Sequence, residues 1–432
     1  MAQPHVVIVG AGFAGFHAAR RLSRVARGRA DVTLVNPTDY FLYLPLLPEV
    51  TGGVLDPRHV AVPLTAALPG VRLVLGEVDE LDVTGRRVGY RDPTGRRDGL
   101  RYDRLVLAAG SVNKLLPIPG VADHAHGFRG IPEALYLRDH LIRQLELADA
   151  ADDPGERAAR CTFVVVGAGY TGTEVAAQGQ LFTEELARRH PRLADVPIRW
   201  LLLDTADTVL PGMQPRLSAT AGRVLRDRGV EVDLGVSVQE ATATGVRLTD
   251  GRTLATHSLI WCVGVRPDPL VEATGLPVDH GRLKVDEYLA VPGHPEILAC
   301  GDAAAVPDPQ HPGRATPMTA QHAVRQGRLA ADNIAASYGT GRRRPYRHRD
   351  LGFVVDLGGW QAAAAPLHVP LSGALARAVT RGYHLAALPA GRARVAADWL
   401  LTALGSRPAV GLGLVPGPAV PLETGAPETL HA

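Results

Sequence analysis

The sequence predicts an α/β protein built on two parallel sheets, and two observations support this prediction. A run of four β-branched residues at 6–9 leads into three glycines spaced as GxGxxG, and an alanine-rich helical run follows at 16–22. The same order of strand, glycine turn and helix recurs at 162–172. One such fingerprint is weak evidence, but two in the same context predict two Rossmann-like dinucleotide-binding domains. We expect an antiparallel β-meander in each, and a small C-terminal segment with amphipathic helices.

The first glycine turn has the properties of a pyrophosphate cradle. Gly10 lets the chain turn tightly, Gly12 lets the backbone approach phosphates without a Cβ in the way, and Gly15 lets helix and strand pack closely. The N-terminus of the following helix then presents unpaired N–H groups and a positive dipole end to the phosphate charges. The first candidate cofactor-binding residues are therefore Gly10, Ala11, Gly12, Phe13, Ala14 and Gly15.

Composition excludes several classes of protein. The chain has 432 residues, enough for two or three domains of roughly 150 residues, and a formal net charge of only +2, so no nucleic-acid partner is indicated. Its cysteines, Cys161, Cys262 and Cys300, are far apart and form no CxxC motif. We therefore predict no redox disulfide, no zinc ribbon and no other metal site, and a reducing, cytoplasmic compartment.

Membrane insertion is not expected from the sequence. The first strand begins within five residues of Met1, which leaves no room for a signal peptide. No apolar run approaches the roughly 18 residues needed to span a bilayer. We expect a chain that is soluble or lies on a membrane surface.

The next strand of the first unit is expected at 31–35 and ends at Asn36. An acidic residue usually stands there and accepts hydrogen bonds from ribose hydroxyls. Asn36 retains a carbonyl acceptor without the charge, and a turn asparagine before Pro37 is the alternative.

Residues 40–54 are rich in leucine, proline and aromatic residues and are too irregular for a helix. They either form the floor of a flavin site or are buried against the neighbouring domain.

Three strand-like runs at 71–78, 86–91 and 100–107, separated by turn residues, predict an antiparallel meander in the first unit. The third run continues into small residues, among them Ala109 and Gly110. Small residues at this strand end would let a cofactor pass close by, and a simple strand-end turn is the alternative.

A helix is predicted at 131–150, and the polar connection at 151–159 indicates a domain boundary. The second fingerprint follows, and Glu174 is expected in the first turn of the helix after it. The glycines of this fingerprint are Gly167, Gly169 and Gly172.

The next strand of the second unit, at 198–203, ends at Asp204. This carboxylate would accept a hydrogen bond from a ribose 2′-hydroxyl and repel a 2′-phosphate, which favours NADH over NADPH. Its spacing from the glycines exceeds the usual 20 or so residues, and we attribute the excess to a helical insertion at 181–190. The unit is expected to repeat the meander and to close at Gly264, with runs at 231–234, 245–249 and 258–263.

Residues from 283 onward are expected to return to the first domain. A strand at 297–300 ends in Gly301 and Asp302, and Pro317 opens a long helical run at 316–338. Small residues recur on one face of this helix at i, i+3 and i+7, which suits either a flat ligand or a close helix contact. These residues are Ala320, Ala323 and Gly327.

The C-terminal segment from Arg342 is basic, with five arginines and His348 within eight residues. A helix beyond Pro370 is predicted to have two faces. The apolar face comprises Leu371, Leu375, Ala378, Val379 and Leu385, and the polar face comprises Arg377, Thr380, Arg381 and His384. Such a helix suits an anionic membrane surface, and ordinary packing on the core is the alternative. Residues 408–432 are rich in proline and glycine and are expected to form a flexible tail.

Over residues 5–340 the chain resembles the two-dinucleotide-binding-domain flavoproteins and, among them, the type II NADH dehydrogenases (NADH:quinone oxidoreductases). The general motifs are VVIVGAGFAG, LVLAAGS, VVVGAGYTGTE, WCVGVRP and LACGD. The narrower motif is AQHAVRQG at 320–327, which resembles the family's quinone-site pattern AQxAxQxG. The rest of the chain resembles the family only loosely.

The resemblance implies that FAD lies on the first unit, that NADH stacks on one side of the flavin, and that quinone approaches from the other. The residues it assigns to FAD are Gly10, Ala11, Gly12, Phe13, Ala14, Gly15, Asn36, Val78, Ala109, Gly110, Gly301, Asp302, Ala320 and Gln321. Those it assigns to NADH are Gly167, Gly169, Tyr170, Thr171, Gly172, Asp204 and Gly264. Gln321 and Gln326 would line the quinone site. Glu174 would lie near the nicotinamide and flavin, with stabilisation of the helix's first turn as the alternative.

The implied chemistry needs no protein nucleophile, because hydride passes from nicotinamide C4 to flavin N5 by positioning. The helix that starts near Pro317 would aim its positive end at the flavin N1–C2=O edge.

The resemblance also implies how the chain is organised and what it does. The FAD-binding domain would comprise 1–125 and 283–345, the NADH-binding domain 155–282, and a C-terminal segment 346–432 would attach to the inner face of the cell membrane. We expect oxidation of NADH and reduction of menaquinone or ubiquinone in a respiratory chain, without proton pumping. The alternatives are a soluble NADH-dependent reductase of a small molecule or ferredoxin, and a redox sensor that binds FAD and NADH with negligible turnover. The sequence does not decide whether the chain forms a homodimer.

Overall fold

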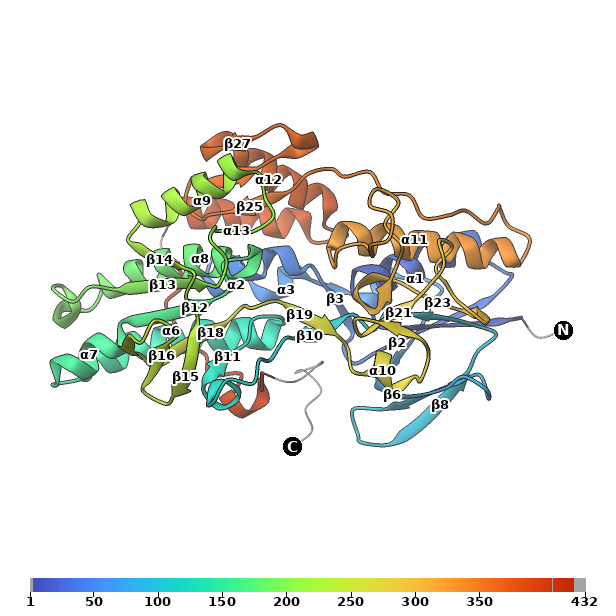
Figure 1. The fold of residues 1–432 in the computed structure, drawn as a ribbon, viewed down its shortest axis with the longest axis horizontal. Coiled ribbons are helices and arrows are strands. Elements are labelled where there is room, and N and C mark those ends of the chain that lie inside the picture. Colours follow the sequence, from blue (N-terminus) through green and yellow to red (C-terminus); the bar gives the residue numbers. More distant parts are fainter. Residues whose placement is uncertain (1–2, 406, 423–432) are drawn as a thin grey trace.

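The computed structural model describes residues 3–405 and 407–422 and has two lobes, each built on a parallel sheet (Figure 1). The six-stranded sheet of the first lobe has the strand order β22-β23-β9-β1-β2-β5, and all neighbours are parallel except β22 and β23. Its strands are β1 (His5–Val9), β2 (Asp31–Asn36), β5 (Arg72–Leu75), β9 (Arg104–Leu107), β22 (Ala290–Val291) and β23 (His294–Ala299).

The five-stranded sheet of the second lobe has the order β11-β18-β12-β13-β14, with every pair parallel. Its strands are β11 (Ala125–His126), β12 (Thr162–Val166), β13 (Arg199–Asp204), β14 (Val230–Leu234) and β18 (Ser258–Trp261). The run β18-β12-β13-β14 repeats the run β9-β1-β2-β5 of the first sheet. The predicted α/β fold with two Rossmann-like units is therefore confirmed.

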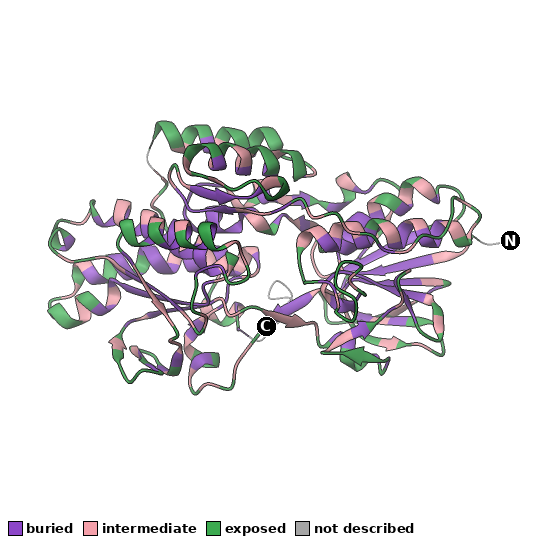
Figure 2. Ribbon diagram, turned by 45° about the horizontal axis from the view of Figure 1, so that its top comes forward, coloured by how far each residue is buried: buried purple, intermediate pink, exposed green. Residues whose placement is uncertain are grey.

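Burial on both faces explains why the parallel strands are continuous apolar runs rather than alternating ones. All five residues of β12 are buried, and so are four of the five residues of β1. Figure 2 shows the strands of both sheets buried and the outer faces of the covering helices exposed.

The two meanders exist, but the sequence assigned several strands to them wrongly. The meander of the first lobe comprises β6 (Glu77–Asp82), β7 (Arg87–Arg91) and β8 (Arg97–Arg101), and that of the second β15 (Val238–Thr242), β16 (Gly245–Leu248) and β17 (Thr253–Ala255). The run at 71–78 breaks at Gly76 into β5 and β6, and the run at 100–107 divides between β8 and β9. The runs at 231–234 and 258–263 belong to the parallel sheet as β14 and β18. Strand propensity is local, whereas the partner of a strand depends on distant segments.

Two helices lie side by side on the first sheet, α1 (Phe13–Val25) and α11 (Ala320–Ser337) (Figure 1). A Cβ at Gly327 would lie 2.0 Å from the carbonyl oxygen of Ala14, so at this position the small-residue face makes a close helix contact. The helix begins at Ala320 and not at Pro317. Thr319 is its N-cap, because its side chain accepts a hydrogen bond from the backbone N–H of His322.

The helices of the second lobe correct two expectations. Helix α6 (Ile131–Ala150) has the predicted bounds, but the expected polar connection contains α7 (Pro154–Arg160), capped by the side chain of Asp153. The expected insertion at 181–190 is largely the continuation of α8 (Tyr170–Ala187), which lengthens the path from the glycines to Asp204. Helix α9 (Pro215–Asp227) follows β13.

The apolar segment 40–54 contains a short helix, contrary to the prediction. It comprises β3 (Tyr40–Leu42), the 3-10 turn η1 (Leu44–Leu46) and α2 (Leu47–Thr51). Pro48 falls in the first turn of α2, where a missing N–H costs no hydrogen bond. A Cβ at Gly52 would lie 3.1 Å from the side chain of Gln178 on α8, so the segment packs against the second lobe.

The C-terminal segment forms a small sheet with two helices. The sheet comprises β25 (Val354–Asp356), β26 (Ala362–Ala364) and β27 (Leu371–Ser372), and the helices are α12 (Gly373–Ala387) and α13 (Arg392–Leu404). Helix α12 turns its predicted polar face inward: Thr380 and His384 are buried, whereas Leu375 is 63% exposed. The expected flexible tail is docked as far as Leu422, because the Gly413 N–H donates to Asp139 at 2.7 Å and Leu422 is buried. Residues 423–432 of that tail lie outside the described residues.

The contact between α1 and α11 predicts opposite effects for two glycine-to-alanine changes in helices. Gly327→Ala pushes a methyl group into the backbone of α1, and we expect a loss of about 2 to 3 kcal/mol of unfolding free energy. Gly382→Ala on α12 has no described atom within 4 Å of the new Cβ and should gain roughly 0.5–1 kcal/mol through helix propensity. The thermal unfolding midpoints of the two variants, compared with that of the wild type, measure these changes in stability. A Gly327→Ala midpoint equal to or above that of the wild type would contradict the close packing.

Candidate functional site

A cavity of about 1400 Å³ opens at the carboxyl ends of β1, β2, β9 and β23. In a parallel α/β sheet this edge is where ligands bind. The wall takes residues from the first glycine turn, the segment 36–48, the start of α8, the N-terminus of α11 and the C-terminal segment. Both lobes and the C-terminal segment therefore contribute to one cavity.

The first glycine turn has the geometry of a phosphate cradle. Gly10 has φ +89°, and a Cβ there would lie 2.4 Å from the Ala108 carbonyl oxygen. A Cβ at Gly15 would lie 1.8 Å from the Gly10 carbonyl oxygen. At Gly12 no described atom lies within 4 Å of the Cβ position, so this backbone faces the open cavity. The turn is thus packed tightly behind and left open in front, which fits the close approach of a pyrophosphate.

The second glycine turn repeats this construction. A Cβ at Gly167 would lie 2.2 Å from the Cys262 carbonyl oxygen, and one at Gly172 would lie 1.8 Å from the Gly167 carbonyl oxygen. Gly169 has open space in front of it, as Gly12 has. The structure thus provides two equivalent cradles, one in each lobe.

Asn36 and Asp204 make equivalent hydrogen bonds in the two lobes, each to a backbone N–H of a glycine turn. The Asn36 Oδ1 accepts the Ala11 N–H at 2.7 Å, and the Asp204 Oδ2 accepts the Ala168 N–H at 2.5 Å. Asn36 also donates from Nδ2 to the Thr38 carbonyl oxygen at 2.9 Å. One acceptor oxygen is enough to hold the glycine turn, so an asparagine can replace the usual acid there. Asn36 fills the expected turn role and also lines the cavity, whereas its contact with a ribose stays a prediction.

Asp302 lies near the first cradle, in the 3-10 turn η3 (Gly301–Ala303). Its Oδ2 accepts the Ser111 hydroxyl at 2.8 Å, and Asp302 and Gly301 line the cavity. Burial raises the pKa of the Asp302 carboxyl. The site therefore offers a carboxyl group held by a serine, beside the first glycine turn.

Gln321 and Gln326 have different positions. Gln321 lines the cavity, donates from Nε2 to the Gly352 carbonyl oxygen at 2.6 Å and thereby joins α11 to the C-terminal segment. Gln326 is buried behind the wall, where Oε1 accepts the Gly301 N–H at 2.8 Å and Nε2 donates to Thr316 at 3.0 Å. This corrects the expectation that Gln326 lines the quinone site. Arg325 stands where the pattern AQxAxQxG has its second glutamine, so the match to Gln326 is one residue out of register.

Glu174 lies on the cavity wall, and the structure excludes the alternative role for it. It is the fifth residue of α8, and the first turn of that helix contains no acidic residue. Its Oε1 accepts the backbone N–H of Asp356 from the C-terminal sheet at 2.9 Å. Burial raises the pKa of Glu174 well above its ordinary value.

The remaining candidates divide into two groups. Ala11, Phe13, Ala14, Gly110, Tyr170, Thr171 and Ala320 line the cavity together with the residues above. The cavity wall does not include Gly15, Val78, Ala109, Gly167, Gly169, Gly172, Asp204 and Gly264. Val78 belongs to the meander strand β6 and packs against the core.

Several wall residues were missed by the sequence reasoning. They are Arg129 and Gly130 before α6, Met213 and Gln214 before α9, His348, and Tyr383 and His384 of α12. These residues come from loops and from α12, and no local sequence motif marks them. Arginine- and histidine-rich stretches in this chain gave no reason to prefer one position over another.

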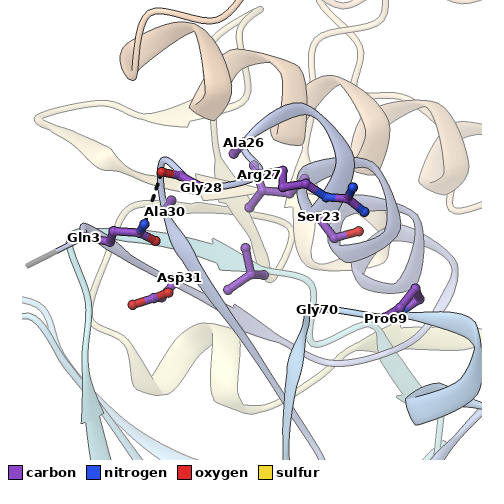
Figure 3. Close-up of a pocket in the computed structure, with 11 residues that line it drawn as sticks. Gln3, Ser23, Ala26, Arg27, Gly28, Ala30, Asp31, Pro69 and Gly70 are labelled. Carbon is purple, nitrogen blue, oxygen red and sulfur yellow. Dashed lines mark hydrogen bonds between the residues drawn. The ribbon is translucent and has the colours of Figure 1, made fainter.

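A second, smaller cavity of about 270 Å³ lies at the amino ends of β1 and β2 (Figure 3). It is lined by Gln3, Ser23, Arg27 and Asp31 among others, and Gln3 donates to the Gly28 carbonyl oxygen at 3.1 Å. It lies at the end of the sheet opposite the glycine turn and is too small for a dinucleotide.

Residues 4–327 match the pyridine nucleotide-disulphide oxidoreductase family. The chain is 31% identical over 420 residues to the type II NADH:quinone oxidoreductase Ndh of Mycobacterium tuberculosis, covering 93% of this chain and 88% of that protein. It is 30% identical to the demethylphylloquinone reductase NdbB of Synechocystis, covering 94% of this chain and 97% of that protein. The solved structure of NDH2 from Plasmodium falciparum in complex with NADH has a TM-score of 0.87 and 18% identity, covering 95% of this chain and 100% of that one, and shows the same fold.

Gly12 faces open space and Gly15 faces backbone, so substitutions at the two positions should separate an effect on cofactor binding from an effect on folding. A Cβ at 12 enters the cavity, so Gly12→Ala should lose FAD on desalting yet unfold at the midpoint of the FAD-free wild type. A Cβ at 15 meets backbone, so Gly15→Ala should lower the unfolding midpoint itself. Flavin absorbance per protein and thermal unfolding measure the two effects. Wild-type FAD content in Gly12→Ala would show that the pyrophosphate does not lie against this turn.

Proposed function

The chain belongs to the type II NADH:quinone oxidoreductases of the pyridine nucleotide-disulphide oxidoreductase family, and we propose that it transfers electrons from NADH through FAD to a quinone without pumping protons. The observation on which the proposal depends is the single cavity that joins the first glycine turn, the start of α8 and Gln321. FAD, when bound, accepts a hydride from NADH and passes the electrons on.

The residues of the first cradle fit FAD. The open backbone at Gly12 and the N-terminus of α1 would hold the pyrophosphate. Asn36 would face the ribose, and Asp302, fixed by Ser111, would hydrogen-bond the ribityl or phosphate region. We assign this site to residues 1–125 and 283–345.

The second cradle fits NADH. Gly169 presents open backbone at the N-terminus of α8, and Asp204 places a carboxylate at the end of β13. A second acid, Asp207, follows in the same loop, and both charges oppose a 2′-phosphate. We assign this site to residues 155–282, with α6 and β11 packed into the same lobe.

Positioning rather than covalent catalysis explains the cavity's composition. Burial raises the pKa of Cys300, which lines the cavity, to about 12, and likewise that of Cys262 to about 12, so both are thiols at neutral pH. All three cysteines are free. The N-terminus of α11 lies at the cavity wall, where the positive end of the helix dipole can stabilise negative charge that develops on a ligand.

Two half-reactions test the proposal. Under anaerobic conditions, NADH should bleach the FAD-loaded full chain, and menaquinone or ubiquinone analogues should then restore the flavin absorbance. Rapid bleaching without reoxidation by either quinone would refute quinone reduction and leave a reductase of another acceptor. Absence of bleaching would refute the NADH step.

Gln321 provides a residue-level prediction. The Gln321 amide lies on the cavity wall and donates to the Gly352 carbonyl oxygen. Gln321→Leu should therefore slow reoxidation by quinone at least tenfold, as expected for loss of a positioned hydrogen bond. The rate of bleaching by NADH should stay within twofold of the wild type. Gln239→Leu on exposed β15 is the matched control and should change neither rate. Equal slowing of both half-reactions would place Gln321 outside the quinone site.

We further propose that the C-terminal helices rest on an anionic membrane surface. Leu400, Leu401 and Leu404 of α13 are exposed, Leu404 by 78%, and Arg392 and Arg394 are exposed at the start of the same helix. Exposed leucines beside arginines suit the interface of an anionic bilayer. Among the described residues, no helix is long and apolar enough to cross a membrane.

Serine replacements test this surface. Replacing Leu400, Leu401 and Leu404 together by Ser should lower partitioning to anionic phospholipid vesicles at least tenfold, because burial of each leucine contributes roughly 1.5 kcal/mol or more. The same three-fold replacement at the exposed Leu75, Leu147 and Val278, which belong to other elements, is the control. Co-sedimentation at low and high salt measures binding. Equal loss in both triple variants would contradict a surface specific to α13.

A further inference from the structure

A two-stranded antiparallel ribbon joins the two lobes beside the cavity. Its strands are β10 (Ser111–Asn113), which follows β9 of the first sheet, and β19 (Val265–Pro267), which follows β18 of the second. Figure 1 shows both strands between the lobes. Ser111 and Val265 line the cavity. The ribbon therefore influences how the two glycine turns face one another.

The chain after α13 returns across both lobes, and we call residues 407–422 the strap. At the start of the strap, the Arg407 N–H donates to Glu185 of α8 at 2.9 Å. The Arg407 guanidinium donates to the Gly52 carbonyl oxygen at 3.0 Å. Because Gly52 belongs to the segment 40–54 of the first lobe and α8 belongs to the second lobe, Arg407 contacts both lobes.

The strap then follows α6 toward the N-terminus of that helix. The Gly413 N–H donates to Asp139 at 2.7 Å. Further along the strap, a Cβ at Gly417 would lie 3.4 Å from the Tyr136 hydroxyl. The direction of the strap is thus opposite to that of α6, and its end lies near the loop that precedes this helix.

The strap ends in the core of the second lobe. The Leu422 side chain is 2% exposed and belongs to an apolar cluster of this lobe that includes Val121, Leu203 and Trp261. Leu414 of the same strap is 67% exposed. Leu422 is therefore an apolar anchor, whereas the middle of the strap lies on the surface.

The backbone carbonyl of Leu422 binds the ribbon. Asn113 of β10 is 6% exposed, and its Nδ2 donates to Glu133 Oε1 at 3.1 Å and to the Leu422 carbonyl oxygen at 3.2 Å. A side-chain amide nitrogen carries two hydrogens, so Glu133 and the strap together use both of them. Loss of the strap would leave a buried donor without its partner, which native structures avoid.

Glu133 connects this contact to the cavity wall. Its Oε2 accepts the backbone N–H groups of Arg129 and Gly130, each at 2.5 Å, and both residues line the cavity. At the other end of β10, Ser111 donates to Asp302 beside the first glycine turn at 2.8 Å. The strap is therefore bonded to a strand whose side chains hold cavity residues in both lobes.

Hydride transfer depends on the relative orientation of the two lobes, because donor and acceptor bind in different cradles. A misplacement of about 1 Å can slow such a step ~100-fold. Domains of one chain move against each other unless their interface prevents it. We propose that the strap fixes the NADH-binding lobe against the FAD-binding lobe, with Leu422 and Asn113 as positioning residues for hydride transfer. The inference rests on the proposed function.

Leu422→Ser tests the strap in the FAD-loaded full chain. The limiting rate of bleaching at saturating NADH should fall about tenfold, because the lobes spend less time in the reactive orientation. The dissociation constant for NAD⁺ and the rate of reoxidation by quinone should stay within about twofold, since each cradle is intact. Leu422→Met keeps the apolar volume and should retain the wild-type rate. Leu414→Ser, at the exposed position of the strap, is the matched control and should change none of these quantities.

Two outcomes would overturn the proposal. One is a limiting bleaching rate in Leu422→Ser that equals that of the wild type. The other is weaker NAD⁺ binding with an unchanged limiting rate, which would assign Leu422 to the NADH site. If Leu422→Ser fails to fold, Arg407→Gln loosens the opposite end of the strap and should slow bleaching without changing NAD⁺ affinity. Wild-type bleaching in that variant would likewise contradict the strap.

Hydrogen exchange tests the ribbon without turnover. In the FAD-loaded chain without NADH or quinone, the backbone amides of β10 and β19 should exchange about tenfold faster in Leu422→Ser than in the wild type, because the ribbon opens more easily. The amides of β2 in the first sheet are the internal reference and should not change. Unchanged exchange in β10 and β19 would overturn the proposal. A wild type that NADH does not bleach would refute the proposed function, whereas this measurement would still decide whether the strap holds the ribbon.

Discussion

Contact of backbone with backbone at glycines is the constraint on which the cofactor-binding face depends. Gly15 brings α1 against the Gly10 carbonyl, and Gly327 brings α11 against the Ala14 carbonyl. Because no side chain separates these elements, the N-termini of α1 and α11 meet at one cavity. The recognition groups then come from neighbouring positions: Asn36 at the end of β2, Asp302 at the end of β23 and Gln321 in the first turn of α11. Gly172 repeats the contact in the second lobe.

The C-terminal segment is organised by charge rather than by apolar packing alone. Helix α12 turns Arg377, Thr380 and His384 toward buried carboxylates and leaves Leu375 exposed. Burying guanidinium groups is costly unless carboxylates accompany them, and Asp356 and Glu49 meet that requirement. The same inversion leaves apolar side chains outside, where they suit a membrane surface. One segment thus joins the surface of the protein to the wall of its active cavity.

Local motifs predicted much of the fold and part of the site. Each glycine fingerprint and the strand that precedes it follow from residues adjacent in the sequence. The hydrogen bonds by which Asn36 and Asp204 hold the two glycine turns were seen only in the structure. The predictions that were wrong concern which segments pair with one another in space. Strands β14 and β18 have the composition of meander strands but pair in the parallel sheet, because the register of β12 and β13 provides a buried edge on each side. Gln326 stands beside a recognised motif position but points at Gly301.

The sequence alone determined the two dinucleotide-binding turns, because their conformation depends on a positive φ and a missing Cβ, which are properties of single residues. Apolar runs also located the parallel strands that lead into the two turns. Only the tertiary structure decided which face of α12 is buried. It also decided the hydrogen bond between Glu49 and Trp399, which are 350 positions apart. Periodicity shows that a helix has two faces, but the side that is buried depends on the charges that distant segments place against it.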